Sequence, residues 1–581
     1  MQQDSTINGL DIKRLPIRSK RQFVPSQADF SDPTQVETLY LALLARPLKT
    51  AADLEAFLLH RSELEAAIRQ HRSVLYIQMT CQTDDTERAA AYRRFIEQIQ
   101  PVIESFTHQQ NTAYLTARDC IGPALPHYTV YERNLRADVA IFRDENIALQ
   151  VEESLLSQEY QTVTGGLTVQ FEGQEITLSK LATFLYEPDR TRRENAWRTA
   201  TDCYFAVRDK LDDIFDKMLE VRGRIARNAG FANYRDYKFH EYHRFDYTPD
   251  DCKAFHAAAQ KVLVPLQCDM WHRRSEEMNL HPLRPWDLVA DTHALPPLKP
   301  FDQPENFIPT MRILFEQLDP ELGAQFAQMH ELGLLDLVSR KGKAPGGYQS
   351  TLDEARKPFI FMNAAGSDDD VRVLLHESGH AFHALASADE PLADYRHAPM
   401  EFCEVASMSM ELLALPQLGV FYDADQQRRR RRHVAESTVR LLLAVAVNDA
   451  FQHWLYEMPG HTRDQRCAKW VELQNAFGQD ALNWTGLERY RGSGWHRILH
   501  FFQVPFYYIE YGIAQLGALG VWRRAKEDYD TALRDYKKAL ALGGSRPLPE
   551  LFVAAGLTFD FSENNVQQAA DMLRNEWESA L

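Results

Sequence analysis

The sequence predicts a mainly α-helical protein with a small amount of β-structure. Apolar residues recur at helical spacing over most of residues 36–115, and long helical patterns also dominate residues 179–230. Alternating β-favouring residues occupy short stretches only, and the clearest, residues 162–178, predicts a hairpin around Glu172-Gly173. A chain of 581 residues with 45% hydrophobic content can bury a large core.

Composition and charge argue against several classes of partner. The formal net charge of -17 argues against nucleic acid or an anionic membrane surface. Five consecutive arginines at 428–432 follow acidic residues and are expected to form a solvated face of a helix. No stretch approaches 18 uninterrupted apolar residues and the first residues are polar, so we expect a cytoplasmic protein. The seven cysteines contain no Cys-x-x-Cys pair, which fits reduced thiols.

A His-Glu-Ser-Gly-His motif that begins at His376 carries the clearest chemical signal. At 3.6 residues per turn, His376 and His380 project from one face of a helix and can reach the same metal ion. Glu377 lies beside the first histidine, where its carboxylate can take a proton from metal-bound water. The helix is expected to begin after Ser367, whose side chain can form a capping box with Asp370.

The motif has an alternative interpretation, because two histidines on an apolar helix can also be satisfied core residues. His383 is expected to be a core or supporting residue. A catalytic metal needs a third protein ligand, and residues 400–413 predict an apolar helix that carries Glu401, Glu404 and Glu411. Glu404 and Glu411 share a face. Either Glu401 or Glu404 is expected to bind, with a modest preference for Glu404, since Glu401 is nearer the helix start.

A short β-favouring run at 359–362 precedes the motif and is bounded by Pro358 and Asn363. As an edge strand it would offer its backbone to an extended peptide; the alternative is that it pairs only with neighbouring strands. The Gly346-Gly347 pair upstream suits a hairpin turn or a mobile loop.

A tyrosine-rich apolar segment offers further polar groups near the end of the chain. Tyr508 and Tyr511 are three residues apart on a predicted helix, so their hydroxyls fall on one face, and His500 lies two to three turns earlier. Donors of this kind can stabilise the negative oxygen that forms when a carbonyl is attacked. Without a metal motif, such a helix more often belongs to the core.

Taken together, these motifs resemble the thimet oligopeptidase clan of zinc metallopeptidases, and most closely its bacterial oligoendopeptidase F group. The resemblance covers roughly residues 160–575. It implies two helical lobes with a deep substrate channel and a small β-sheet beside the active-site helix. We therefore expect an irregular N-terminal segment at 1–35, a helical lobe with the hairpin at 36–195 and the catalytic domain at 196–581. The segments that agree are 285–287, 340–348, 358–363, 376–380, 404–413 and 499–511.

The resemblance also implies roles for individual residues. It implies one zinc ion per chain, held by His376, His380 and Glu404, with Glu377 as general base and acid. Glu411 matches an acidic position behind the ligands, where it would orient a zinc-binding imidazole or form only an interhelix hydrogen bond. The other implied residues are His500, Tyr508 and Tyr511 as catalytic donors, and Gly346, Gly347, Tyr348, Phe361 and Tyr507 as substrate-binding residues, with Tyr507 as an alternative oxyanion donor.

The function that follows is zinc-dependent hydrolysis of internal bonds in short unstructured peptides, with Glu377 activating zinc-bound water. The expected partners are short peptides, with no nucleic acid and no membrane, and homo-oligomerisation is left open. Two alternatives are an aminopeptidase, for which the sequence offers no motif that reads a free amine, and a non-catalytic peptide-binding protein that retains the zinc groove. The presence of Glu377, Glu404, His500 and Tyr511 argues against the second alternative.

Overall fold

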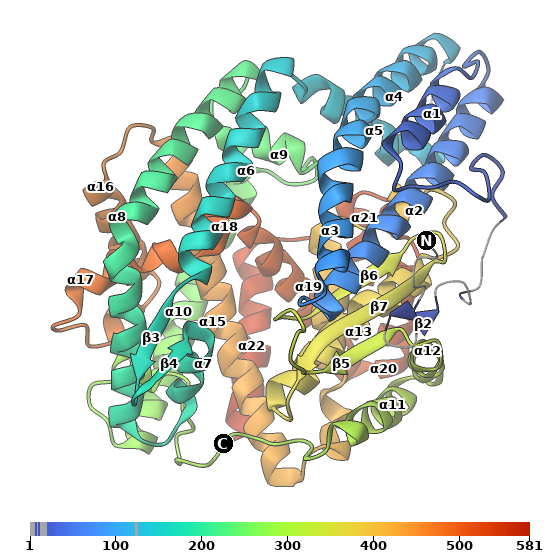
Figure 1. The fold of residues 1–581 in the computed structure, drawn as a ribbon. Coiled ribbons are helices and arrows are strands. Elements are labelled where there is room, and N and C mark those ends of the chain that lie inside the picture. The colour runs from blue at the N-terminus through green and yellow to red at the C-terminus, as the bar shows by residue number, and fades with distance from the viewer. Residues whose placement is uncertain (1–5, 8–9, 12–14, 16–19, 123–125) are drawn as a thin grey trace. The chain divides into compact units, whose positions relative to one another are not determined.

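Helices form most of the protein, as the sequence predicts (Figure 1). The structure is a computed structural model that describes residues 6–7, 10–11, 15, 20–122 and 126–581. Much of the segment expected to be irregular, residues 1–35, lies outside the described residues. Within it, strands β1 (Thr6–Ile7) and β2 (Leu10–Asp11) form a short antiparallel pair.

Two compact units alternate along the chain. The first comprises Met1–Val139, Lys299–Gln427 and Gly517–Phe559, and the second comprises Ala140–Leu298, Arg428–Leu516 and Asp560–Leu581. Each unit is therefore assembled from three separate stretches. The expected division into a lobe at 36–195 and a catalytic domain at 196–581 stays a prediction, as does the deep substrate channel.

The first unit contains the motif helix and the helix expected to supply the third ligand. Capping side chains start several of its helices; at the start of α2, for example, Thr50 and Asp53 form a capping box. The helices are α1 (Pro33–Leu44), α2 (Ala51–Cys81), α3 (Thr86–Arg94), α4 (Gln100–Ile121), α5 (Thr129–Ile141), α11 (Phe307–Leu318), α12 (Pro320–Glu331), α13 (Asp368–Ala386), α14 (Met400–Leu413), α20 (Tyr529–Leu540) and α21 (Leu548–Ala554).

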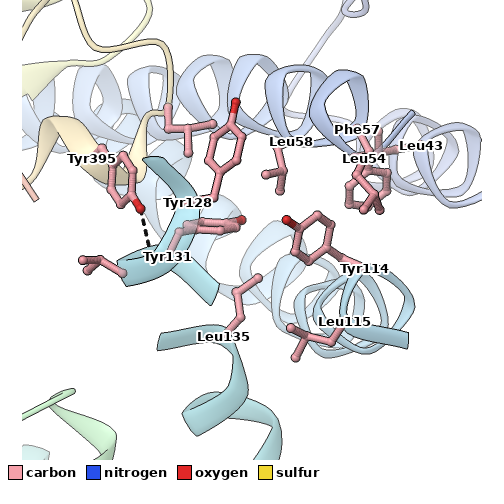
Figure 2. Close-up of a cluster of buried hydrophobic side chains, with 12 residues drawn as sticks. Leu43, Leu54, Phe57, Leu58, Tyr114, Leu115, Tyr128, Tyr131, Leu135 and Tyr395 are labelled. Carbon is pink, nitrogen blue, oxygen red and sulfur yellow. Dashed lines mark hydrogen bonds between the residues drawn. The ribbon is translucent and has the colours of Figure 1, made fainter. Parts of the chain in front are cut away.

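Part of the core of this unit joins its N-terminal helices to the segment between α13 and α14. Figure 2 shows tyrosine and leucine side chains that pack together there. The Tyr395 hydroxyl accepts a hydrogen bond from the Tyr131 backbone N–H (2.9 Å) and donates one to the His127 carbonyl (2.8 Å). The buried hydroxyl thus has a partner both as an acceptor and as a donor, and the two hydrogen bonds fix the segment that leads into α14.

A three-stranded sheet lies beside α13 in the first unit (Figure 1). Its strands are β5 (Leu335–Val338), β6 (Tyr348–Leu352) and β7 (Lys357–Ala364), in the order β5-β7-β6. Strand β7 pairs in parallel with β5 and antiparallel with β6. Of the two alternatives for residues 359–362, the edge strand is therefore wrong and pairing with neighbouring strands is correct, because β7 is the central strand and β6 lies at the edge. A strand buried on both faces, as β7 is, suits the centre of a sheet.

The second unit is also helical and contains the predicted hairpin. Strands β3 (Thr168–Phe171) and β4 (Gln174–Thr177) pair around Glu172-Gly173, both with positive φ, as a tight hairpin turn requires. The hairpin begins later than predicted because a helix extends to Gly165. The helices are α6 (Asp144–Gly165), α7 (Leu178–Ala182), α8 (Arg190–Asn228), α9 (Tyr234–Glu241), α10 (Pro249–Met278), α15 (Ala424–Glu457, mostly in this unit), α16 (Arg463–Ala476), α17 (Glu488–Arg491), α18 (Leu499–Gln503), α19 (Tyr508–Glu527, which ends in the first unit) and α22 (Glu563–Ser579).

The run of five arginines lies in helix α15, as predicted, but several of them are ion-paired rather than simply solvated. Arg432 contacts Glu277 at 2.7 Å and Glu436 at 2.9 Å, and Arg431 pairs with Glu576. These glutamates neutralise positive charge that a nucleic-acid-binding surface would need to expose. Among the described residues, no helix combines the length and apolar character needed to cross a membrane.

Candidate active site

Helix α13 begins where the sequence predicts. Ser367 caps it and forms a capping box with Asp370. One carboxylate oxygen of Asp370 also accepts hydrogen bonds from the backbone N–H groups of Ala365, Gly366 and Ser367, each at 2.8 Å. These bonds fix the start of the helix and therefore the direction in which its histidines point.

Gly379 allows helix α14 to approach the motif closely. A methyl group at position 379 would lie 2.5 Å from the Cα atom of Ser407 and 2.8 Å from the Ala406 carbonyl oxygen. These are backbone atoms, so a side chain could be accommodated only if the helices moved apart. This role was not predicted, and the small size of the residue beside His380 is the only signal of it in the sequence.

The close approach brings three potential metal ligands together. One donor atom from each of His376, His380 and Glu404 lies within 4.8 Å of the other two. A Glu404 carboxylate oxygen is 3.4 Å from His376 Nε2 and 3.8 Å from His380 Nε2. Ligand atoms of a tetrahedral zinc site are separated by roughly 3.3 Å, so these residues fit a zinc ion. Glu401 is not in this group of donors.

A second carboxylate orients the first histidine. His376 Nδ1 and a Glu411 oxygen are 2.7 Å apart, which leaves Nε2 directed toward Glu404. Ser407 donates a hydrogen bond to the Glu404 carboxylate at 3.0 Å. A metal-binding imidazole is commonly oriented, as His376 is by Glu411, through a carboxylate bonded to the ring nitrogen that does not bind the metal. His383, by contrast, is buried and packs against Phe402, as expected for a core residue.

The charges in this group depend on one another. Burial lowers the pKa of His380 to about 4, whereas the adjacent carboxylates of Glu404 and Glu411 outweigh burial and raise the pKa of His376 to about 10. Burial raises the pKa of Glu377 to about 7, opposed in part by the charge of His376 and, less strongly, by the backbone N–H of Gln349. A carboxyl group with such a pKa can both accept and release a proton near neutral pH.

The turn before strand β6 is fixed in the described structure. Gly346 has φ 93°, and the Asn363 side chain donates hydrogen bonds to the carbonyls of Ala344 (2.8 Å) and Gly346 (2.9 Å). The Tyr348 hydroxyl hydrogen-bonds with Thr80 at 2.6 Å. This segment is thus a turn that leads into a strand, but it is not the predicted hairpin, because β6 pairs with β7 and not with the preceding strand β5.

Phe361 lies on the neighbouring strand β7, directly opposite Tyr348. Its side chain is fully buried and stacks on the ring of Tyr348 at 4.8 Å between centroids. The phenylalanine therefore supports Tyr348, and direct contact with a peptide would require the core to open. The reason is the central position of β7, which places its side chains in the core.

The histidine and tyrosines expected to act as catalytic donors form one group in the second unit. His500 lies in α18, and its ring centroid is 4.5 Å from that of Tyr508 and 5.8 Å from that of Tyr511. Tyr507 lies 5.2 Å from Tyr511. Burial lowers the pKa of His500 to about 4, so its ring is neutral at pH 7.

The segment is not one continuous helix. Phe506, between α18 and α19, has φ 67°, and its N–H donates a hydrogen bond to Gln452 at 2.5 Å. The break separates His500 from the helix that carries Tyr508 and Tyr511, so their proximity results from the turn rather than from helical spacing.

Comparison with known proteins identifies the family. The family model described as "Peptidase family M3" matches residues 183–570. The chain belongs to peptidase family M3. This confirms the family predicted from the motifs and accounts for their order along the chain.

Curated relatives of this M3 peptidase match part of its length. An oligoendopeptidase F homolog of Borreliella burgdorferi is 25% identical over 245 residues, which is 40% of each chain. Oligopeptidase PepF of Bacillus subtilis is 23% identical over 245 residues, 41% of this chain and 36% of the relative. The matched stretch thus spans about two fifths of these curated relatives.

Solved structures match the M3 peptidase over nearly its whole length. A putative oligoendopeptidase F is 27% identical with a TM-score of 0.85, and covers 96% of this chain and 99% of its own. A structure described as PZ peptidase A with inhibitor 2 is 26% identical, with a TM-score of 0.84 and the same coverage. A putative oligoendopeptidase F from Bacillus anthracis, at 24% identity and a TM-score of 0.80 over 97% of this chain and 98% of its own, supports the fold alone.

Proposed function

We propose that this M3 peptidase is a zinc-dependent oligoendopeptidase that hydrolyses internal bonds of short, unstructured peptides. The observation that carries this proposal is the convergence of donor atoms from His376, His380 and Glu404 beside the buried carboxyl group of Glu377. Membership of a peptidase family supports the same conclusion. A cytoplasmic location remains a prediction.

The ligand set proposed for zinc is His376, His380 and Glu404, with Glu411 holding the second nitrogen of His376. When bound, a zinc ion polarises a peptide carbonyl and makes water more acidic. Two imidazoles and one carboxylate are a common donor set for catalytic zinc, and His376 would release a proton when it binds the metal. The Glu411 hydrogen bond fixes the ring orientation and increases the basicity of the ligating nitrogen.

Glu377 is proposed as the group that moves the proton. Its carboxylate takes a proton from the attacking water and delivers it to the leaving amine as the peptide bond breaks. The pKa of about 7 that results from burial suits both steps. The charge of His376 and the backbone N–H of Gln349 on strand β6 both oppose the effect of burial and favour the carboxylate form.

Strand β6 is proposed as the edge along which a peptide binds. It is the outer strand on its side of β7, and the backbone N–H of its residue Gln349 lowers the pKa of Glu377. An extended peptide that added to this edge would be recognised mainly through its backbone, so many sequences would be accepted. Gly346, Gly347 and Tyr348 would line the start of this edge.

His500, Tyr508 and Tyr511 are proposed to bind substrate and stabilise the oxyanion, with Tyr507 as the alternative donor. We expect Tyr508→Phe and Tyr511→Phe each to lower kcat by about a hundredfold or more, because each removes one donor that acts as charge develops. Tyr507→Phe is expected to change kcat less. Steady-state kinetics on one peptide would test this order, and a larger loss for Tyr507→Phe would transfer the role to Tyr507.

The proposed activity is tested by digesting short peptides blocked at both ends and identifying the products by mass. We expect paired internal fragments, loss of cleavage with a chelator and recovery with zinc. A folded protein containing the same cleavable sequence is the control and should stay intact. Stepwise removal of residues from unblocked peptides alone would indicate an aminopeptidase, and binding without cleavage would indicate a peptide-binding protein.

A further inference from the structure

Two helices of the second unit carry a second set of potential metal ligands. Cys252 and His256 are four residues apart on α10, and Asp449 and His453 are four residues apart on α15. Each pair therefore lies on one helical face, with the same spacing as the histidines of the motif. The peptidase function proposed above uses none of these side chains.

The donor atoms of this cluster converge. Cys252 Sγ, an Asp449 oxygen and a His453 ring nitrogen lie within 4.8 Å of one another, the same limit that encloses the ligands proposed in the first unit. The three residues are 0%, 1% and 3% exposed, so they lie in the interior rather than on an acidic surface. His256 Nε2 contacts an Asp449 oxygen at 2.8 Å.

Hydrogen bonds within the described part of the chain do not satisfy these groups. There, neither ring nitrogen of His453 has a hydrogen-bond partner, nor does one oxygen of Asp449. His453 Nε2 lies 3.3 Å from the other Asp449 oxygen, but the two atoms do not have hydrogen-bond geometry. A buried polar group that stays unpaired destabilises the folded state. Buried polar atoms that lack hydrogen-bond partners and lie close together indicate a site where an ion or small molecule binds.

Charge and donor type indicate which ligand. A Cys252 thiolate and an Asp449 carboxylate carry two negative charges, which one divalent cation would neutralise in a buried site. Arg244 is also close to Cys252, but its guanidinium is paired with Glu510 at 2.5 Å. A thiolate, an imidazole and a carboxylate favour zinc over calcium or magnesium, which prefer oxygen ligands.

We propose that Cys252, Asp449 and His453 bind a second divalent metal, most suitably zinc, that joins α10 to α15. His256 would position the Asp449 carboxylate through the 2.8 Å contact. Binding converts the Cys252 thiol to a thiolate and releases its proton to solvent. The site would be structural, and it raises the expected number of metal ions per chain from one to two.

Cobalt substitution tests this proposal, because only a thiolate ligand gives a charge-transfer band in the near ultraviolet. The ligands proposed in the first unit contain no cysteine. The full-length protein would be freed of metal with a chelator and titrated with Co²⁺. We expect two equivalents to bind and the thiolate band to rise with one of them. Binding of one equivalent without this band would overturn the proposal and leave a hydrogen-bonded cluster.

Two cysteine variants assign the band. Cys252→Ser is expected to abolish it and to lower bound cobalt by one equivalent. Cys403→Ser is the matched control, since Cys403 adjoins Glu404 and would be the source of a thiolate band from the first unit. A band that survives in Cys252→Ser, or disappears in Cys403→Ser, would contradict the assignment. The unsubstituted protein already gives a decisive result if the Cys252 variant fails to fold. Peptide cleavage enters neither readout, so failure here leaves the proposed function untouched.

Discussion

Glu377→Gln is expected to lower kcat by about a thousandfold while the metal stays bound. Glutamine keeps the size of the side chain but cannot carry a proton from water to the leaving amine, and general acid–base catalysis contributes about 10²–10⁴-fold. KM should change little, since the peptide backbone is proposed to bind along β6. Steady-state kinetics together with metal analysis on the same sample would measure both effects.

Asp369→Asn is the control for this substitution. Asp369 lies on the same helix and its side chain is 68% exposed, so the variant also removes one negative charge from α13, but at the surface. Its kcat should match that of the unsubstituted protein. If Glu377→Gln cleaved peptides at the normal rate, Glu377 would not be the proton carrier.

Glu404→Ala is expected to abolish turnover by removing the third ligand. The two histidines alone hold zinc weakly, and the buried imidazoles lose the carboxylate that faces them at 3.4 Å and 3.8 Å. Glu401→Ala is a matched control, because both glutamates lie on α14 and are similarly buried, at 6% and 8% exposure. Peptide turnover in the two variants separates the alternatives that the sequence left open. Loss of activity in Glu401→Ala alone would assign the ligand to Glu401.

Local signals predicted the elements of the first unit that carry the proposed ligands. The capping pair Ser367 and Asp370 marked the start of α13, and the apolar run at 400–413 gave the bounds of α14. Capping, spacing and apolar periodicity act between residues close in sequence, so they can be read without knowing the fold. The four-residue spacing of His376 and His380 placed both rings on one face for the same reason.

Contacts between distant segments could not be predicted in this way. The run at 359–362 could have been an edge strand or a strand paired on both sides, and the structure shows the second, since β5 pairs with it in parallel from a separate segment. Strand order depends on such distant partners, whereas β-propensity does not report them. Gly379 permits the approach of α14 only because Ser407 lies opposite it in the folded chain. Likewise, the pairing of Cys252 with His453 requires two helices to meet.

His376, His380 and Glu404 are proposed to hold a metal ion, and the other proposed roles in the first unit depend on this site. Elemental analysis of protein never exposed to chelators tests it most directly, on the unsubstituted chain and on the Glu404→Ala and Glu401→Ala variants. We predict one equivalent less metal in Glu404→Ala than in the unsubstituted chain, and an unchanged amount in Glu401→Ala. Equal metal content in Glu404→Ala and the unsubstituted chain would contradict the claim.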